Sequence, residues 1–163
     1  MPTSCEIRPA VREDAPLLLE LIGGLADYEH LRDQLVLDSA LLERHLFGER
    51  PAAEATIAEV GGAAVGYALF FPTFSTFLGQ PGIWLEDLFV LPAHRRVGIG
   101  RALLLHVARL ALARDCGRLE WSALDWNEPA LAFYRGLGAS RLDEWRLHRL
   151  DAAALAAVVR SEG

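Results

Sequence analysis

The apolar residues in the first half of the chain follow helical spacing in two segments and strand patterns in three others. Helical spacing predicts a first helix that carries Leu17, Leu18, Leu21, Ile22 and Leu25. A second helix is expected to begin after Asp38 and to end at Gly48. Apolar runs predict strands over residues 5–9, 55–60 and 64–71. The last two strands should form an antiparallel hairpin around Gly61-Gly62.

The second half of the chain opens with a strongly apolar strand. It covers residues 83–91, and two adjacent acids, Glu86 and Asp87, interrupt it. Residues 72–82, before it, are typical of a loop. The next expected elements are a helix and a strand, over residues 98–114 and 118–124. A strand, a helix and a strand in this order predict a right-handed crossover between two parallel strands.

The C-terminal part should add a short helix, a strand and a last helix. Asn127 would cap the short helix, with Pro129 in its first turn and Gly136 at its end. The other two elements are expected over residues 146–150 and 151–160. Together the patterns predict a single domain over residues 1–163, of the α/β class, with a mixed, mostly antiparallel sheet flanked by helices.

Length and composition fit such a domain. The chain has 163 residues, of which 52% are hydrophobic, so it can bury a core of ordinary size. No stretch approaches the roughly 18 to 20 apolar residues that span a bilayer, and the N-terminus lacks a signal-peptide pattern. We therefore expect a soluble cytoplasmic protein with no membrane partner.

Charge and residue usage exclude several classes of function. The net charge of −6 argues against a nucleic-acid partner and is compatible with a cationic small molecule. Cys5 and Cys116 lack the spacing of a disulfide framework or a zinc site, so no metal is expected. The chain contains no lysine. Neither a Walker A phosphate loop nor Schiff-base chemistry can therefore operate.

A glycine-containing segment between a predicted strand and a predicted helix is a candidate anion site. It consists of Arg95, Arg96, Val97, Gly98, Ile99, Gly100 and Arg101. Backbone amides at a helix start can converge on an anion, glycine allows a phosphate to approach, and the arginines add positive charge. Alternatively, the glycines only allow a tight turn. A dinucleotide fold fits poorly, because Leu103 stands where that motif has its third glycine.

With these residues the chain resembles the GNAT superfamily of N-acetyltransferases. The family's acetyl-CoA loop, R/Q-x-x-G-x-G/A, is matched by Arg95-x-x-Gly98-x-Gly100. Further matches are Leu85-Glu86-Asp87-Leu88-Phe89-Val90, Trp126-Asn127-Glu128-Pro129, Phe133-Tyr134 and Gly138-Ala139-Ser140. The ordered set is similar to the diamine (spermidine/spermine) acetyltransferase branch and its thialysine-acetylating relatives. This resemblance implies the GNAT fold, acetyl-CoA as cosubstrate, a small-molecule amine acceptor and a homodimer.

Direct acetyl transfer to an amine requires a proton acceptor for the amine and a proton donor for the departing thiolate. Tyr134 can be a core tyrosine, but the resemblance places the family's general acid at this position. For Glu86 the resemblance implies contact with the substrate amine and acceptance of its proton through water. Neighbours on a strand point to opposite faces, so at least one of Glu86 and Asp87 should be partly buried. We expect Asp87 to be a hydrogen-bonded structural acid.

The resemblance also implies binding roles for other residues. Backbone groups of Leu88, Phe89 and Val90 would hold the thioester and pantetheine, with a bulge in their strand. Asn127 and Pro129 would lie at the cofactor. The substrate amine would meet Tyr28, Glu29, Glu86 and Glu120. Without the resemblance, Tyr28 and Glu29 fit an exposed helix end and Glu120 a solvated strand edge.

One departure from the polyamine enzymes leaves the substrate open. Those enzymes carry an acid and a tryptophan where this chain has Ser75 and Phe77. The loss of an anion should weaken binding of a long polycation, so a shorter amine or an amino-acid side chain also fits. The alternatives are a GNAT enzyme acting on a peptide or antibiotic amine, and a regulatory module that binds acyl-CoA without turnover.

Overall fold

The structure is a computed structural model that describes residues 5–161. The chain divides into two compact units, one ending at Ser122 and the other beginning at Ala123. Each unit is described separately below. A single domain over residues 1–163 stays a prediction. Within residues 5–161, no helix combines the length and apolar character that crossing a membrane requires.

The first unit is built on a five-stranded sheet in the order β1-β2-β3-β4-β5. The strands are β1 (Cys5–Pro9), β2 (Glu54–Val60), β3 (Ala63–Ser75), β4 (Gln80–Val90) and β5 (Leu119–Glu120). The pairs β1–β2, β2–β3 and β3–β4 are antiparallel, and β4–β5 is parallel. The predicted mixed, mostly antiparallel sheet is therefore confirmed.

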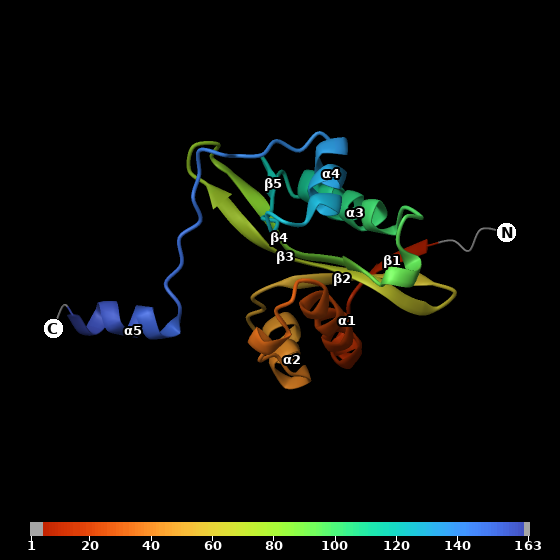
Figure 1. Cartoon of the computed structure of the whole chain (residues 1–163), viewed down its shortest axis with the longest axis horizontal. Coiled ribbons are helices and arrows are strands. Elements are labelled where there is room, and N and C mark those ends of the chain that lie inside the picture. Colours follow the sequence, from red (N-terminus) through yellow and green to blue (C-terminus); the bar gives the residue numbers. More distant parts are fainter. Residues whose placement is uncertain (1–4, 162–163) are drawn as a thin grey trace. The chain divides into compact units, whose positions relative to one another are not determined.

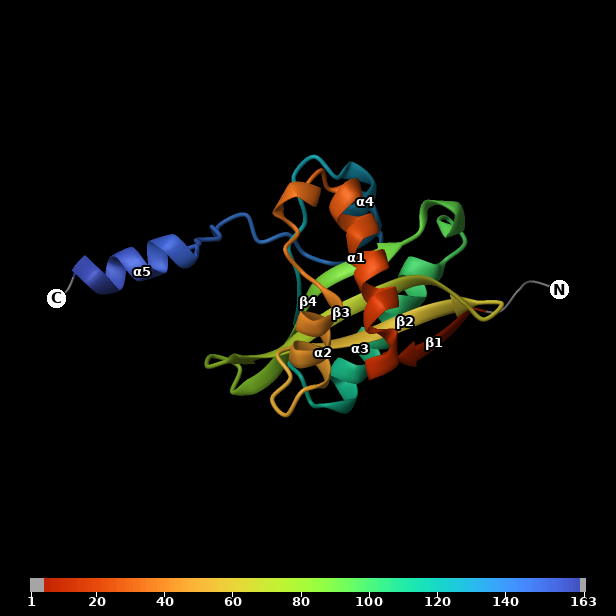
Figure 2. The same cartoon turned by 90° about the horizontal axis from the view of Figure 1, so that it is seen from below.

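Helices cover both faces of this sheet. Helices α1 (Ala15–Tyr28) and α2 (Ser39–Phe47) pack on one face, and α3 (Ile99–Ala113) on the other (Figures 1 and 2). Within residues 5–161, 3-10 turns connect the elements at Arg12–Asp14, Arg32–Gln34 and Pro92–His94. The Asp38 side chain accepts a hydrogen bond from Leu41 N at 2.8 Å, as expected of a helix cap.

The face covered by α1, which we call the α1 face, carries one continuous apolar core. Leu18 and Leu21 of α1 pack there with Ile57, Tyr67 and Phe89 of the sheet. A β-carbon on Gly24 would lie 3.0 Å from the Phe89 ring. The glycine that weakens the helix locally therefore allows α1 to approach β4 closely.

Residues 72–82 differ from the predicted loop. Strands β3 and β4 continue through them as a long hairpin, in which Pro72 pairs with Ile83 and Phe74 with Pro81. The pairing of β2 with β3 already ends at Phe70, so Pro72 lies on an edge where its missing N–H costs no ladder bond. Pro72, which favours a loop in the sequence, therefore fits in β3 because no neighbouring strand needs its N–H.

Two expected strands also differ from the structure. The strand predicted over 118–124 is reduced to Leu119–Glu120, and residues 146–150 form no strand. Alternation of apolar residues shows which segments can pair, but a strand also needs a neighbour to accept its backbone hydrogen bonds. Sequence periodicity does not contain that information.

The second unit contains α4 (Glu128–Gly136) and α5 (Ala152–Ser161). Asn127 is the N-cap residue of α4, as predicted. Its backbone lies outside the extended region usual for a cap, however, and its side chain makes no cap hydrogen bond. The carbonyl of Asn127 accepts from Leu131 N at 3.0 Å. The α5 helix is capped by Asp151, which accepts from Ala154 N at 2.9 Å.

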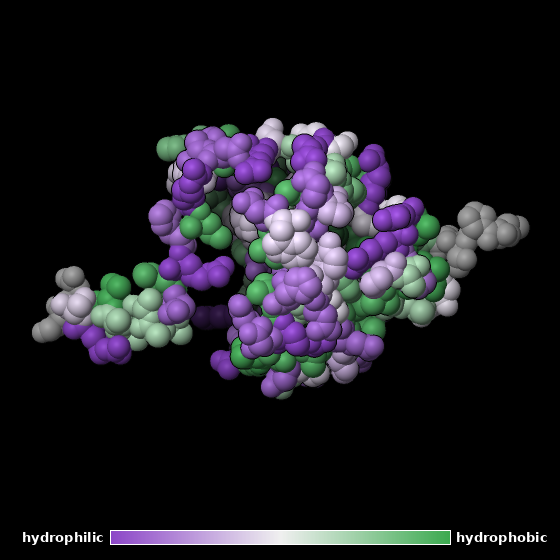
Figure 3. Space-filling model, in the orientation of Figure 1, coloured by the Kyte–Doolittle hydropathy of each residue, from purple (hydrophilic) through white to green (hydrophobic). Residues whose placement is uncertain are grey.

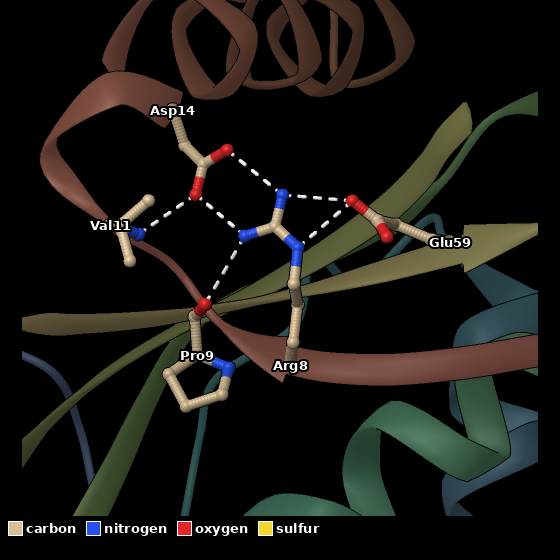
Figure 4. Close-up of polar contacts among 5 residues, drawn as sticks. All are labelled: Arg8, Pro9, Val11, Asp14 and Glu59. Carbon is tan, nitrogen blue, oxygen red and sulfur yellow. Dashed lines mark hydrogen bonds and ion pairs between the residues drawn. The ribbon is translucent and has the colours of Figure 1, made fainter. Parts of the chain in front are cut away.

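A polar network joins β1 to the start of α1 (Figure 4). The two terminal nitrogens of Arg8 donate to the Asp14 carboxylate at 2.7 and 2.9 Å, and Arg8 Nε donates to Glu59 at 2.9 Å. Asp14 also accepts from Val11 N at 2.7 Å. The hydrogen bonds from Arg8 hold the pKa of this buried carboxyl below its ordinary value, although burial opposes the shift.

Replacing Asp14 by asparagine should therefore lower the free energy of unfolding by about 1–3 kcal/mol at pH 7. Because the folded pKa is depressed, the ionised carboxyl contributes its full stability above its unfolded pKa of about 3.9. The contribution is lost as the pH falls through the folded pKa. The difference between wild type and variant, measured by urea unfolding, should shrink as the pH falls below about 4.

Asp27 provides the matched control, because its ion pair with Arg32 is exposed to solvent. The change Asp27→Asn should have little effect on unfolding. Equal losses in the two variants would show that burial of the Arg8–Asp14 pair is unimportant.

Candidate active site

The glycine loop lies between β4 and α3, as predicted. Gly98 immediately precedes α3 and has a left-handed φ of 91°, and Arg96 has a φ of 65°. Ile99 is buried, whereas the neighbouring Val97 is exposed. Ala102 N donates to the Gly98 carbonyl at 2.9 Å. The amides of residues 99–101 precede this first helical bond and are oriented along the start of the helix.

The fold requires a glycine at only one of the two glycine positions in this loop. A side chain at Gly98 would be strained by its positive φ, so the tight-turn alternative explains this glycine. At Gly100 a β-carbon would meet only Val90 Cγ2 within the described residues, at an ordinary 3.8 Å. The fold therefore does not require a glycine at position 100. Its absent side chain leaves space at the helix start, which an anion can use.

Arg95 is turned away from the role that its sequence position suggests. Its Nε donates to the Val90 carbonyl at 2.8 Å. Its guanidinium carbon lies 4.7 Å from the centre of the Tyr28 ring and 5.4 Å from that of Phe89. Arg95 thus connects the loop to the end of α1 and to β4 through cation–π contacts. Arg96 and Arg101 are exposed beside the glycines.

Strand β4 contains a bulge at Glu86. Leu85 pairs with Phe70 and Asp87 pairs with Leu69, so the partner strand has no residue opposite Glu86. The bulge expected from the resemblance is therefore present. A bulge removes one step of the side-chain alternation and redirects the side chains beside it.

The bulge corrects the prediction that Glu86 and Asp87 point to opposite faces. Leu69, opposite Asp87, packs into the core of the α1 face. Trp84 lies on the same face, because its partner Phe71 is two residues from Leu69. Trp84 Nε1 donates to Glu86 Oε2 at 2.9 Å, which places the Glu86 carboxylate beside it. Both acids therefore belong to the α1 face.

Asp87 is the hydrogen-bonded acid that the sequence predicts. It accepts from the hydroxyl of the fully buried Tyr67 at 2.9 Å. Burial raises the pKa of Asp87 to about 6; the Tyr67 hydrogen bond opposes this, and the charges of Glu86 and Glu29 add to it. Burial and the negative charge of Asp87 hold the Tyr67 pKa well above its ordinary value, so Tyr67 remains a donor.

Glu29 completes a group of three carboxylates. It follows the last residue of α1, next to Tyr28. Burial raises the pKa of Glu29, and the charge of Glu86 raises it further. Because the charge of Glu86 raises the pKa of both Glu29 and Asp87, a cation would be favoured among these carboxylates. We call Glu29, Glu86 and Asp87 the acid cluster.

The remaining sequence candidates are distributed over the two units. Glu120 lies opposite Trp84 in the β4–β5 pair and forms an ion pair with Arg118 Nε at 2.7 Å. In the described chain, β5 pairs with β4 only at Ile83 and Trp84. The backbone groups of residues 88–90 that face the β5 side of β4 therefore have no partner in β5. In the second unit, Tyr134 lies on α4, where its ring centre is 5.4 Å from that of Phe133.

Tyr67 and Trp84, which donate hydrogen bonds to Asp87 and Glu86, are not among the site residues predicted from the sequence. Tyr67 lies in an apolar strand pattern that gives no sign of its acidic partner. The tryptophan two residues before Glu86 lies on the same face by ordinary strand alternation, so the sequence pattern itself could have indicated it as a donor to Glu86. Among residues 5–161, no group of three or more His, Cys, Asp or Glu side chains is arranged to hold a metal ion.

Comparisons with known proteins agree with this architecture. Residues 24–139 match the model of the acetyltransferase (GNAT) family. Thialysine N-epsilon-acetyltransferase of Bos taurus is 37% identical over 160 residues, which cover 91% of this chain and 94% of that protein. L-ornithine N5-acetyltransferase of Arabidopsis thaliana is 44% identical over 93 residues, covering 57% of this chain and 41% of the relative.

A solved structure shows the same fold over almost the whole chain. An integron cassette protein from V. cholerae superposes with a TM-score of 0.82 at 26% identity, covering 96% of this chain and 98% of that one. The family match spans the bulged strand, the glycine loop and the segment that carries Tyr134. The chain is therefore an N-acetyltransferase of the GNAT family and belongs to its diamine acetyltransferase-like branch.

Proposed function

We propose that this enzyme transfers an acetyl group from acetyl-CoA to a primary amine of a small cationic molecule, a polyamine, a diamine or a thialysine-like amino acid. The observation that carries the proposal is the acid cluster. Glu29, Glu86 and Asp87 gather on the α1 face at the bulge of β4, the strand that leads into the glycine loop. Strand β4, whose acids would bind the cationic amine, is therefore followed along the chain by the start of α3, which would bind the anionic pyrophosphate.

The loop residues suit the pyrophosphate of acetyl-CoA. The space at Gly100 admits a group that a β-carbon would crowd, and the amides of residues 99–101 supply donors at the positive end of α3. Arg96 and Arg101 would add charge from the solvent side. Arg95 would act by shaping the loop through Val90 and Tyr28. The open edge of residues 88–90 would hold the pantetheine, with Asn127 and Pro129 also at the cofactor.

Acetyl-CoA supplies the activated thioester. The Glu86 carboxylate would accept a proton from the substrate ammonium through water, so that the neutral amine can attack. Tyr134 would donate a proton to the departing sulfur. The C–N bond forms and the C–S bond breaks, and the balance is an amide, a thiol and one released proton. Tyr28, Glu29 and Glu120 would orient the amine.

A panel of amines tests the function. Thiol release from acetyl-CoA should be steady with at least one of spermidine, short diamines, L-lysine, L-ornithine and thialysine. Thiol release that occurs only with peptide N-termini or aminoglycosides would contradict the proposed acceptor and indicate a peptide or antibiotic N-acetyltransferase. Tight CoA binding without release on any amine would indicate a regulatory acyl-CoA-binding module.

We also propose that the enzyme is a homodimer. The second unit exposes large apolar side chains, seen along α5 in Figure 3. They include Trp145, Leu147, Leu155 and Val159. A soluble monomer rarely leaves so much apolar surface on one short segment, and burial against a second copy would remove it from water. Sedimentation velocity measures this directly, and a monomer at micromolar concentration would contradict it.

A further inference from the structure

An arginine shares the α1 face with the acid cluster. Arg118 directly precedes β5, and its carbonyl accepts a hydrogen bond from Ile83 N at 3.1 Å. A β-carbon built on Gly82 would lie 3.6 Å from Arg118 Cγ, so the arginine stem passes over the side-chain face of Gly82. Gly82 and Trp84 are two residues apart in a regular stretch of β4 and therefore face the same way. Arg118 thus lies over the α1 face.

Charged and apolar groups follow one another along this face. Arg118 lies at Gly82, the indole of Trp84 comes next, and Trp84 Nε1 donates to Glu86 at the bulge. Gly82 and Glu86 are four residues apart, which is about 13 Å at the ordinary rise of a strand. A positive group, an aromatic surface and a negative cluster are therefore arranged in line.

The ion pair with Glu120 leaves most of the guanidinium available. The contact is made through Arg118 Nε, with 46% of the arginine side chain exposed and 30% of the glutamate. A guanidinium carries five N–H donors in a fixed fork that matches the two oxygens of a carboxylate. Glu120 holds the fork in place while the terminal nitrogens can bind a second anion.

The hairpin turn beyond Arg118 offers no carboxylate at positions 75 and 77, which are a serine and a phenylalanine. The Ser75 hydroxyl accepts from Leu78 N at 3.2 Å and stabilises the hairpin turn. Phe77 is 99% exposed at the tip of that turn. A diamine bound along this face would place its second ammonium group beside the Arg118 guanidinium, and it carries no carboxylate that could bind this guanidinium.

We propose that Arg118 is a specificity-determining residue that binds the α-carboxylate of the acceptor, so that the enzyme prefers amino acids with a side-chain amine over polyamines. The inference rests on the proposed function, in which the acid cluster receives the amine. The acceptor's side-chain ammonium lies at Glu86, its aliphatic chain crosses the Trp84 indole, and its carboxylate reaches the Arg118 fork. The α-ammonium beside that carboxylate meets Glu120, the ion-pair partner of Arg118. Each charged group of the amino acid then has a partner of opposite charge.

Matched substrate pairs test this proposal. L-ornithine is compared with 1,4-diaminobutane, and L-lysine with 1,5-diaminopentane, because each pair differs only by the carboxylate. The wild type should prefer the amino acid by about tenfold or more in kcat/KM. The change Arg118→Gln should lower kcat/KM for the amino acids by about 10–100-fold, mainly through KM, and leave the diamines unchanged or improved. Arg118→Lys should restore part of the loss.

Arg114→Gln is the control, since Arg114 also forms an exposed ion pair, with Glu54, but lies at the end of α3. It should leave both kinds of substrate unaffected. Equal losses for amino acids and diamines in Arg118→Gln, or no preference in the wild type, would overturn the proposal.

Calorimetric binding of the same pairs separates this inference from the proposed function. Binding that depends on the carboxylate and is lost in Arg118→Gln supports the role of Arg118 even if no thiol is released. Absence of carboxylate-dependent binding overturns it, even if diamines are acetylated.

Discussion

Replacing Tyr134 by phenylalanine is expected to lower kcat by about 10²–10⁴, the range usual for the loss of a general acid. The change removes only the hydroxyl and keeps the ring that packs against Phe133. Affinity for acetyl-CoA should change little, because a proton donated during the reaction contributes to the transition state and not to ground-state binding. Steady-state kinetics and CoA titration together measure the two effects.

The pH profile distinguishes proton donation from a structural role for this tyrosine. If the phenol donates a proton, the alkaline decline of kcat should disappear in Tyr134→Phe. A lower rate with an unchanged profile would indicate that the ring only positions other groups. Unchanged turnover would remove Tyr134 from the mechanism.

The sequence predicts the first unit well where the signal is local. The apolar spacing of Leu17 to Leu25 locates α1, and Asp38 locates the start of α2 through a cap that the structure contains. The position of the glycine loop is also predicted correctly, because Gly98 marks the boundary between a strand and a helix through its own backbone conformation. These features depend on residues within a few positions of one another.

The parts that the sequence did not predict depend on pairing between strands. The bulge at Glu86 is a shift in register between β3 and β4, and no residue type in Leu85-Glu86-Asp87 requires it. It alone brings Glu86 onto the same face as Asp87. The resemblance therefore indicates Glu29 and Glu86 as residues that meet the amine, but it includes neither Asp87 as their neighbour nor the arrangement of the three carboxylates in space.

Arg95 illustrates the same limit for a single side chain. Its position in the motif favours a cation at the pyrophosphate, yet its contacts with Tyr28 and Phe89 require α1 and β4 to meet at the loop. That meeting depends on Gly24, about seventy positions earlier in the chain, which allows the helix to approach the Phe89 ring. Only the assembled core determines where the guanidinium goes.

Introducing an aspartate at Gly100 should raise the Kd for acetyl-CoA by about 100-fold, equivalent to about 2.7 kcal/mol. The fold itself should tolerate the change. A β-carbon there meets Val90 Cγ2 at 3.8 Å, and an acid in the first turn of a helix interacts favourably with the helix dipole. The loss would come from a carboxylate that crowds and repels the pyrophosphate. Gly100→Ala should give a smaller loss of affinity with unchanged or slightly higher stability.

Ala40→Asp is the control, because Ala40 is an exposed residue in the first turn of α2 and gains the same charge in the same kind of position. A second substrate then locates the effect. S-acetylpantetheine carries the thioester but lacks the pyrophosphate, so wild type and Gly100→Asp should use it equally well. If the variant loses activity with both donors, Gly100 acts through the shape of the loop; if it loses neither, the pyrophosphate is bound elsewhere.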